Sequence, residues 1–314
     1  MGSSEVVGGI DTYILYKTQS VFTTSVTPDT IFGGLIKSAS FGVDRQYNER
    51  VGFVGTQAHD GRATAQQLAG TVVTNGSVDF DVQRWDWLQH VLLGTRTGTG
   101  TTATPYIYSV GRDNGFLTVT EEIVNTGPNS HRVYPGMVIN SASISCSVGE
   151  PVTANLTLLG GQLTKSTTVT AKQAQLTDEV YNFSGGSIEL PSGTALNNII
   201  DSVSFDINNN YTMIYGFNEE AKNAKPGKLN IGVKLTLKYL DDTVIEQLLG
   251  GSAGVGNQTV VDLKIKFAKG SSKYVEFEFN DVVLNRVETS HNLNEFVVED
   301  IDIIPRKLVV KEVV

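Results

Sequence analysis

Hydrophobic and polar residues alternate along most of this chain, which is the pattern of β-strands with one buried face. In the clearest case Val261, Leu263, Ile265 and Phe267 point one way, and the charged residues between them point the other way. Similar alternation predicts strands over 36–47, 75–84, 106–110, 116–124 and 137–159, and then over 260–268, 273–279 and 282–304. The pattern therefore predicts a mainly β protein.

Two short segments replace this alternation with helical spacing. From Trp85 to Leu93 the apolar residues fall on one helical face, and Gly94 follows as a C-cap. The second segment, 241–249, has an apolar stripe that includes Leu248 and is followed by Gly250. We expect one short helix in each half of the chain.

The two halves also share a sequence signature. Residues 38–53 align without a gap on 202–217, with identical residues at six of the sixteen positions. Two further blocks follow in the same order: Val78–Val82 aligns with Val233–Leu237, and 138–158 aligns with 283–303. A period of about 155 residues is too long for a solenoid repeat, so these blocks indicate two homologous domains.

We predict two β-sandwich or small-barrel domains, each with one flanking short α-helix. Their expected limits are 36–164 and 165–304, with an extended N-terminal arm over 1–35 and a C-terminal tail over 305–314. Thr12–Tyr16 has the composition of a strand but no evident copy in the second half. A polar connection over 54–74 is about twice as long as its equivalent at 218–228.

Composition agrees with this fold class. The 314 residues are 40% hydrophobic and 18% charged, with 32 glycines and 8 prolines, as expected of a globular chain rich in strands and turns. The formal net charge of −9 argues against a protein that grips nucleic acid through its phosphates, because such binding needs a basic face.

Cysteine usage and the N-terminus exclude two further classes. The single cysteine, Cys146, rules out an intrachain disulfide framework, and its place in a strand predicts a small buried side chain. Met1–Glu5 lacks the basic and apolar regions of a signal peptide, and no stretch approaches the ~18–20 apolar residues that span a bilayer. We expect a soluble assembly unit that is made in the cytoplasm and binds no membrane.

Catalytic chemistry has no counterpart in the sequence. The histidines His59, His90, His131 and His291 have no second His or Cys at metal-ligand spacing, and no P-loop, nucleophile elbow or dinucleotide fingerprint is present. The run from Asp206 to Asn210 begins like a calcium loop but lacks the required glycine and glutamate. We predict no catalytic, cofactor-binding or metal-binding residues and no enzyme.

Several segments resemble one protein family. They are Ser202–Asn210, Tyr215–Phe217, the Pro226–Gly227 turn, Gly232–Leu237 and Gly136–Glu150. These segments are similar to tail tube proteins of tailed bacterial and archaeal viruses. The resemblance implies a β-sandwich with a flanking helix, whose subunits join their sheets around a central channel. It also implies rings that stack into a tube, through which the genome and the tape-measure protein pass.

Duplication and resemblance together lead to specific expectations. Rings of single-domain tube proteins are hexameric, so a chain with two copies should form a pseudo-hexameric ring from three chains. Expected partners are the chain itself, the tape-measure, terminator and baseplate proteins, and viral DNA that passes without specific binding. The expected location is the virion tail, after assembly in the host cytoplasm. Alternatives are another tail ring component (initiator, terminator or baseplate protein) or a two-domain β-sandwich binding module.

Particular residues carry structural expectations in this interpretation. Core or helix-docking anchors are expected at Phe41, Phe205, Trp85, Trp87, Leu92 and Leu248. Candidates for the channel lining are Asp79, Asp81, Lys234 and Lys238, and candidates for assembly elements are the arm 1–35, the loop 54–74 and the tail 305–314.

Overall fold

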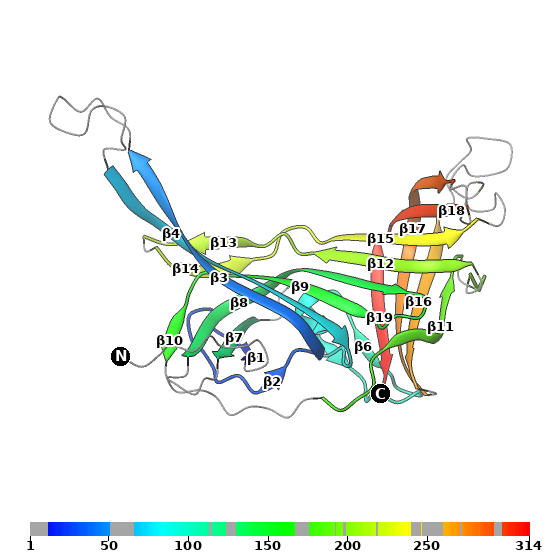
Figure 1. Ribbon diagram of the computed structural model, residues 1–314, viewed down its shortest axis with the longest axis horizontal. Coiled ribbons are helices and arrows are strands. Elements are labelled where there is room, and N and C mark those ends of the chain that lie inside the picture. Colours follow the sequence, from blue (N-terminus) through cyan, green and yellow to red (C-terminus); the bar gives the residue numbers. More distant parts are fainter. Residues whose placement is uncertain are drawn as a thin grey trace, which may run out of the picture.

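The strands form a continuous antiparallel network, which is described most simply as three sheets that share strands (Figure 1). This computed structural model describes residues 12–50, 66–112, 115–123, 130–166, 176–191, 193–196, 199–217, 219–239, 246, 260–270, 272–291 and 297–314. The backbone alone is described at 48–50 and 66–69. The fold is mainly β, as the sequence predicts.

The largest sheet, here named the long sheet, runs through both halves of the chain. Its strands are β3 (Gly34–Arg50), β4 (Gln66–Val82), β8 (Ser130–Ser147), β9 (Thr153–Gly160), β12 (Ile200–Asn208), β15 (Asn230–Lys238), β17 (Lys273–Ser290) and β18 (Val298–Ile304). Their spatial order is β3–β4–β9–β8–β12–β15–β18–β17. The pairing of β8 with β12 therefore joins the two halves through backbone hydrogen bonds.

Two further sheets cover one face of the long sheet. The first contains β1 (Thr12–Gln19), β2 (Thr30–Ile31), β7 (Phe116–Ile123), β8 and β10 (Thr164–Ser166). The second contains β5 (Arg96–Thr97), β6 (Tyr106–Tyr108), β11 (Asn182–Glu189), β16 (Val261–Lys269), β17 and β19 (Lys307–Val313). A separate hairpin, β13 (Thr212–Tyr215) and β14 (Ala221–Lys225), continues the line of β12 and β15 (Figure 1).

The two halves of the long sheet have the same order of strands and the same registers. β3–β4–β9–β8 corresponds to β12–β15–β18–β17. Leu158 pairs with Ile139 in the first half, and their aligned counterparts, Ile303 and Leu284, pair with each other in the second. The strand order and the registers of the two halves are therefore equivalent.

Irregularities in the ladders also occur at matching places. The β3–β4 ladder skips Lys37 and the β12–β15 ladder skips Asp201, and each of these residues immediately precedes its half's copy of the first aligned block. The β8–β9 ladder skips Asn140, and the β17–β18 ladder skips its aligned counterpart Asn285. A bulge inserts one extra residue at a defined position of a strand. The matching positions of the bulges therefore indicate that the halves are equivalent without relying on the alternation of apolar residues.

The two covering sheets also have equivalent orders of strands. β1–β7–β8–β10 corresponds to β11–β16–β17–β19. Val133 pairs with Thr164 on β10, and Glu278 pairs with Val309 on β19, as expected when the alignment of β8 on β17 is extended without a gap. The strand at the N-terminus thus has a counterpart, β11, which the sequence comparison missed.

One of the three sequence alignments is shifted by two residues. Val78 pairs with Ala39, whereas Val203, the counterpart of Ala39, pairs with Leu235 rather than with Val233. A shift of two residues keeps each side chain on its face of the sheet, because the period of a strand is two. The hydrophobic pattern alone therefore could not detect this error.

Parts of the predicted arm, tail and polar connection belong to the sheets. Thr12–Gln19 of the predicted arm pairs with β7 along its whole length, and Lys307–Val313 of the predicted tail pairs with β17 and β6. Residues 66–74, predicted as part of a polar connection, form the first half of β4 because they pair with β3. Residues 1–11 and 54–65 lie outside the described part of the chain.

The helix of the first half, α1, is shorter than its pattern suggests and spans Leu88–Val91. Leu93, at φ 53°, takes the left-handed turn that we expected at Gly94. Gly94 is needed for a different reason, since a Cβ there would lie 1.7 Å from the carbonyl oxygen of Ser109. The helix predicted over 241–249 lies outside the described residues apart from Glu246, which is helical.

The buried faces of the sheets meet in a core that extends through both halves. Trp85 and Phe205 are buried there, and each packs against Phe277 of β17, with ring centroids 5.3 Å and 4.7 Å apart. Of the other predicted anchors, Trp87 and Leu92 are buried, Phe41 is half-buried and Leu248 lies outside the described residues.

Candidate functional site: open sheet edges and a cavity between the halves

The long sheet has one open edge at each end. Within the described residues, β3 pairs only with β4, and residues 286–290 of β17 pair only with β18. Each edge therefore presents a row of backbone N–H and C=O groups without a neighbouring strand. Natural monomers usually cover or shorten such edges, because open edges recruit other strands. Their presence at both ends of one sheet indicates an assembly surface.

The face of the long sheet that points away from the core is polar. Small polar side chains dominate its centre, among them Ser141, Ser143, Ser145, Asn155, Thr157, Ser202 and Ser204. Its acidic residues are Asp44, Asp79, Asp81, Asp206, Glu288, Asp300 and Asp302, and its basic residues are Lys37, Lys234, Lys238 and Arg286. The four residues predicted to line a channel share this face, where acidic groups outnumber basic ones.

Ion pairs partly neutralise this face. Lys37 Nζ lies 2.9 Å from Asp81 Oδ1, and Lys234 Nζ lies 3.0 Å from Asp300 Oδ2. The pKa of Lys37 is raised, chiefly by its hydrogen bond to Asp81. The basic groups with close partners are therefore not available as a continuous anion-binding track.

The hairpin of β3 and β4 extends well beyond the body of the molecule (Figure 1). Tyr47, near its end, is 58% exposed. Two residues before Tyr47, Arg45 forms an ion pair with Glu219, and the N–H of Val72 donates to the carbonyl of Glu219 at 2.8 Å. The β13–β14 hairpin of the second half thus supports the β3–β4 hairpin of the first, and its turn presents Phe217 as a fully exposed aromatic.

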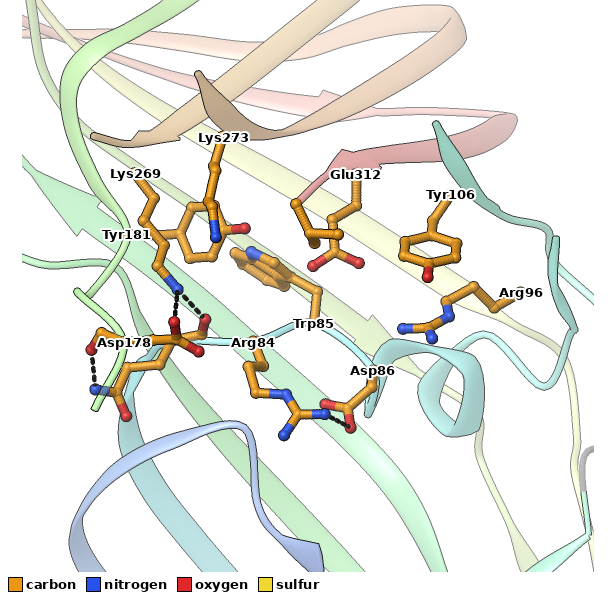
Figure 2. A pocket seen from close by; sticks show the side chains of 12 residues that line it. Arg84, Trp85, Asp86, Arg96, Tyr106, Asp178, Tyr181, Lys269, Lys273 and Glu312 are labelled. Atoms are coloured by element: carbon orange, nitrogen blue, oxygen red, sulfur yellow. Dashed lines mark hydrogen bonds and ion pairs between the residues drawn. The ribbon is translucent and has the colours of Figure 1, made fainter. Parts of the chain in front are cut away.

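A cavity of about 220 Å³ lies between the two halves (Figure 2). The first half contributes residues at 83–86, 96 and 106, and the second half contributes residues at 178, 181, 269, 273, 312 and 314. Figure 2 shows two ion pairs among its lining residues, Lys269 with Asp178 at one end and Arg84 with Asp86 nearer the middle. Arg96 and Tyr106 lie at the other end. Its lining is largely polar although it adjoins the core.

Buried charges in this cavity have specific partners. Lys269 is 7% exposed, and its ammonium donates to the carbonyl of Gln83 at 3.0 Å. Burial lowers the pKa of Lys269, although Asp178 opposes that shift. Glu312 is 3% exposed and accepts a hydrogen bond from the hydroxyl of Tyr108. Burial raises the pKa of Glu312, while Tyr108 and Arg96 act in the opposite direction. The cavity thus links the halves by hydrogen bonds and ion pairs.

The Glu312 carboxyl should make stability depend on pH. Its raised pKa means that the folded state holds this proton more tightly than the unfolded chain does. The resulting stabilisation is complete below the unfolded pKa, about 4.5, and is lost as pH rises through the folded pKa. We expect the free energy of unfolding of the wild type to fall relative to Glu312→Gln as pH rises, measured by urea denaturation at several pH values. A constant difference across the pH range would contradict this expectation.

The described histidines do not form a catalytic or metal-binding group. His90 lies 3.3 Å from the hydroxyl of Thr18, His131 lies 2.6 Å from the buried carboxylate of Glu122, and His291 is exposed at the end of β17. His59 lies outside the described residues. In the described part of the chain, no three His, Cys, Asp or Glu residues lie close enough to hold a metal ion.

Cys146 lies in the core, where it pairs with Val203 across the joint between the halves. Burial raises the pKa of its thiol to about 11, so the reactive thiolate is scarce at neutral pH. We expect iodoacetamide to label native Cys146 at least about 100-fold more slowly than the urea-unfolded chain, as followed by intact mass. Equal rates would show that this joint opens readily.

None of the helices in the described residues is long and apolar enough to cross a membrane. The interior of the described chain is instead filled by the side chains of the sheets. The features that remain as candidates for function are the open edges, the polar face and the projecting hairpin. All three are surfaces on which other protein chains could pack or pair.

Comparison with known proteins agrees with these features. No curated protein matches the chain significantly. The family model described as phage tail tube protein matches residues 9–291, which include the whole β3–β4 hairpin and both open edges of the long sheet. Because this match covers most of both halves, the chain belongs to the phage tail tube protein family.

Proposed function

We propose that this chain is the major tail tube subunit, which assembles into stacked rings around a channel for the viral genome. One observation carries the proposal: the long sheet crosses from one half to the other by backbone pairing and, among the described residues, has no further strand at either end. A sheet of this kind can continue from chain to chain, and heterologous contacts of one type form a ring when the rotation between neighbours closes.

The ladders also support a division into two tube domains. We place the first copy at 12–166 and the second at 182–313, because β1 and β10 bound one set of equivalent strands, and β11 and β19 bound the other. These limits replace the proposed arm and tail with strands inside each copy. If single-domain tube rings contain six copies of one domain, three of these chains make an equivalent ring.

The polar face of the long sheet is proposed to line the channel. Serines, threonines and asparagines give it a surface without a strongly basic track, and its acidic excess repels phosphates. DNA would then slide without specific binding, and no catalytic step is needed. The tape-measure, terminator and baseplate proteins are the proposed partners within the tail, after assembly in the host cytoplasm.

The projecting β3–β4 hairpin is the proposed contact between stacked rings. It extends away from the sheets and carries exposed Tyr47 near its end. Replacing 51–65 by the dipeptide Asn-Gly should leave the β3–β4 ladder intact, because two residues are enough to connect paired antiparallel strands. We expect single rings but few tubes from this variant by electron microscopy. Normal tubes from the shortened variant would exclude a stacking role for residues 51–65.

Electron microscopy of the purified chain at increasing concentration tests the proposed function. Long hollow tubes are expected, because each ring can stack on the next through the same contacts. Closed single rings would instead favour another ring component of the tail, and monomers at all concentrations would favour a two-domain binding module.

A further inference from the structure

The joint between the two halves gives a template for contact between chains. Residues 141–147 of β8 lie between β9 on one side and β12 on the other. Their described counterparts in the second half, residues 286–290, pair with β18 on one side and have no described strand on the other. β3 is the counterpart of β12 and likewise lacks a strand on one side among the described residues. The open edge of β17 therefore corresponds to the β8 side of the joint inside the chain, and the open edge of β3 corresponds to its β12 side.

We infer that β17 of one chain pairs antiparallel with β3 of a second copy in the register of the β8–β12 joint. Within the chain Asn208 pairs with Ser141, Ile207 with Ala142, Phe205 with Ile144, and Ser204 with Ser145. Exchanging each residue for its counterpart in the other half places Asp44 opposite Arg286, Val43 opposite Val287, Phe41 opposite Thr289, and Ser40 opposite Ser290. This inference rests on the proposed assembly into rings and specifies its contact.

Exposure of equivalent residues supports this pairing. Ile207 is 0% exposed where β8 lies beside it, whereas its counterpart Val43 is 43% exposed on the open edge. Phe205 is 1% exposed, and its counterpart Phe41 is only half-buried. The apolar residues of β3 thus face the core side but lack the neighbour that covers their equivalents. A second copy of this chain would supply that neighbour with Val287 and Thr289.

Charge and side-chain direction select this register over its neighbours. Asp44 and Arg286 have opposite charges and would be directly opposed on the polar face, where such pairs are favourable. Arg286 already contacts Glu288 within its own strand, so Asp44 would add a second carboxylate to one guanidinium. A register displaced by two residues could oppose Asp44 with Glu288, and a displacement by one would turn Val43 against the polar face.

Engineered disulfides can measure the register directly. Opposed residues in an antiparallel pair have Cα atoms about 4.5–5.5 Å apart, within the range of a disulfide, whereas diagonal pairs are too distant. The test variant carries Ser40→Cys and Ser290→Cys in a Cys146→Ala background. The matched control carries Ser40→Cys and Glu288→Cys, because Glu288 lies two residues away on the same face. Each single-cysteine variant completes the set.

We expect mild oxidation of assembled Ser40→Cys/Ser290→Cys to give covalent dimers and closed trimers on non-reducing gels, with a 40–290 linked peptide by mass spectrometry. The control pair should stay largely monomeric. Tubes that form without this link, or that link through the control pair, would overturn the register but leave the proposed function intact. Dispersed monomers without the link, by electron microscopy of the same samples, would overturn both.

A charge exchange provides a second test that needs no disulfide. Asp44→Arg alone should oppose two guanidinium groups and suppress assembly, as should Arg286→Asp alone through repulsion between carboxylates. Mixing these two variants restores opposite charges wherever unlike chains meet, and combining both changes in one chain restores them at every joint. Recovery of tubes in the double variant supports the register. Equal assembly of all variants would overturn the role of this pair.

Discussion

Replacing Trp85 with alanine is expected to lower the free energy of unfolding by about 3–5 kcal/mol, the usual cost of removing a large buried aromatic side chain. Trp85 is 0% exposed, and its ring centroid lies 5.6 Å from Trp87, 5.5 Å from Tyr181 and 5.3 Å from Phe277. Tyr181 and Phe277 come from the second half of the chain. The loss would therefore weaken the contact between the halves as well as the first half itself.

Urea denaturation of dilute, unassembled protein measures this effect. Phe217→Ala is the matched control, since Phe217 is fully exposed and its removal should change the free energy by no more than about 0.5 kcal/mol. If the two halves shared no core, Trp85→Ala would leave the unfolding transition of the second half at its wild-type midpoint. That result would contradict the continuous core.

The second large effect is expected at Asn209, which follows β12 but reaches into the first half. Its side-chain amide donates to the carbonyl of Val91 at 2.9 Å and to that of Ile139 at 3.1 Å. Asn209 is 1% exposed, so Asn209→Ala leaves two buried carbonyls without this donor. An unsatisfied buried polar group costs roughly 1–3 kcal/mol, and we expect a total loss of about 2–4 kcal/mol.

The same denaturation experiment tests Asn209, with exposed Asn230→Ala as its control. Asn209→Ala should move the midpoint to lower urea, while Asn230→Ala should leave it within error. Equal midpoints for the two variants would mean that water replaces the lost donor and that this bond does not hold α1 in place.

Local alternation was sufficient to predict most strands of the long sheet but not their partners. The sequence from Val261 to Phe267 shows which side chains are buried, because successive residues of a strand point alternately to the core and to the surface. Strand pairing is non-local, so nothing in Val78 itself shows that its equivalent is Leu235 rather than Val233. Registers and bulges were needed to settle that correspondence.

Two strands were missed because their alternation is weak. Residues 66–74 contain glutamines, threonines and Gly70, and resemble a polar connection until they are paired with β3. β11 contains Gly185 and Gly186, so it shares little sequence with β1 although both pair with equivalent strands. In both cases the partner strand, rather than the local sequence, determines the conformation.

The cavity between the halves could not be predicted from sequence either. Lys269 and Glu312 occupy strand ends with the polar character of surface positions. They are buried because β11, β16 and β19 of the second half close against Gln83 and Tyr108 of the first. The burial of these two side chains depends on how the two halves pack together. The open edges likewise depend on which strands pair with each other, and pairing is not encoded in any one strand.

The proposed duplication within one chain would reduce the number of contacts that a ring must form between chains. One of every two joints around the proposed ring is already made inside a chain, by β8 and β12, and needs no association between molecules. Only three joints would then have to form between chains, which lowers the entropic cost of closing the ring.

The symmetry and mass of the ring reveal whether two tube domains are fused in each chain. Cryo-electron microscopy of assembled tubes, combined with native mass spectrometry of dissociated rings, counts the chains in each ring. We expect three chains, with threefold symmetry and a pseudo-sixfold wall in which the long sheets join edge to edge. A ring of six chains, or a wall in which β3 and β17 of neighbouring chains do not meet, would contradict it.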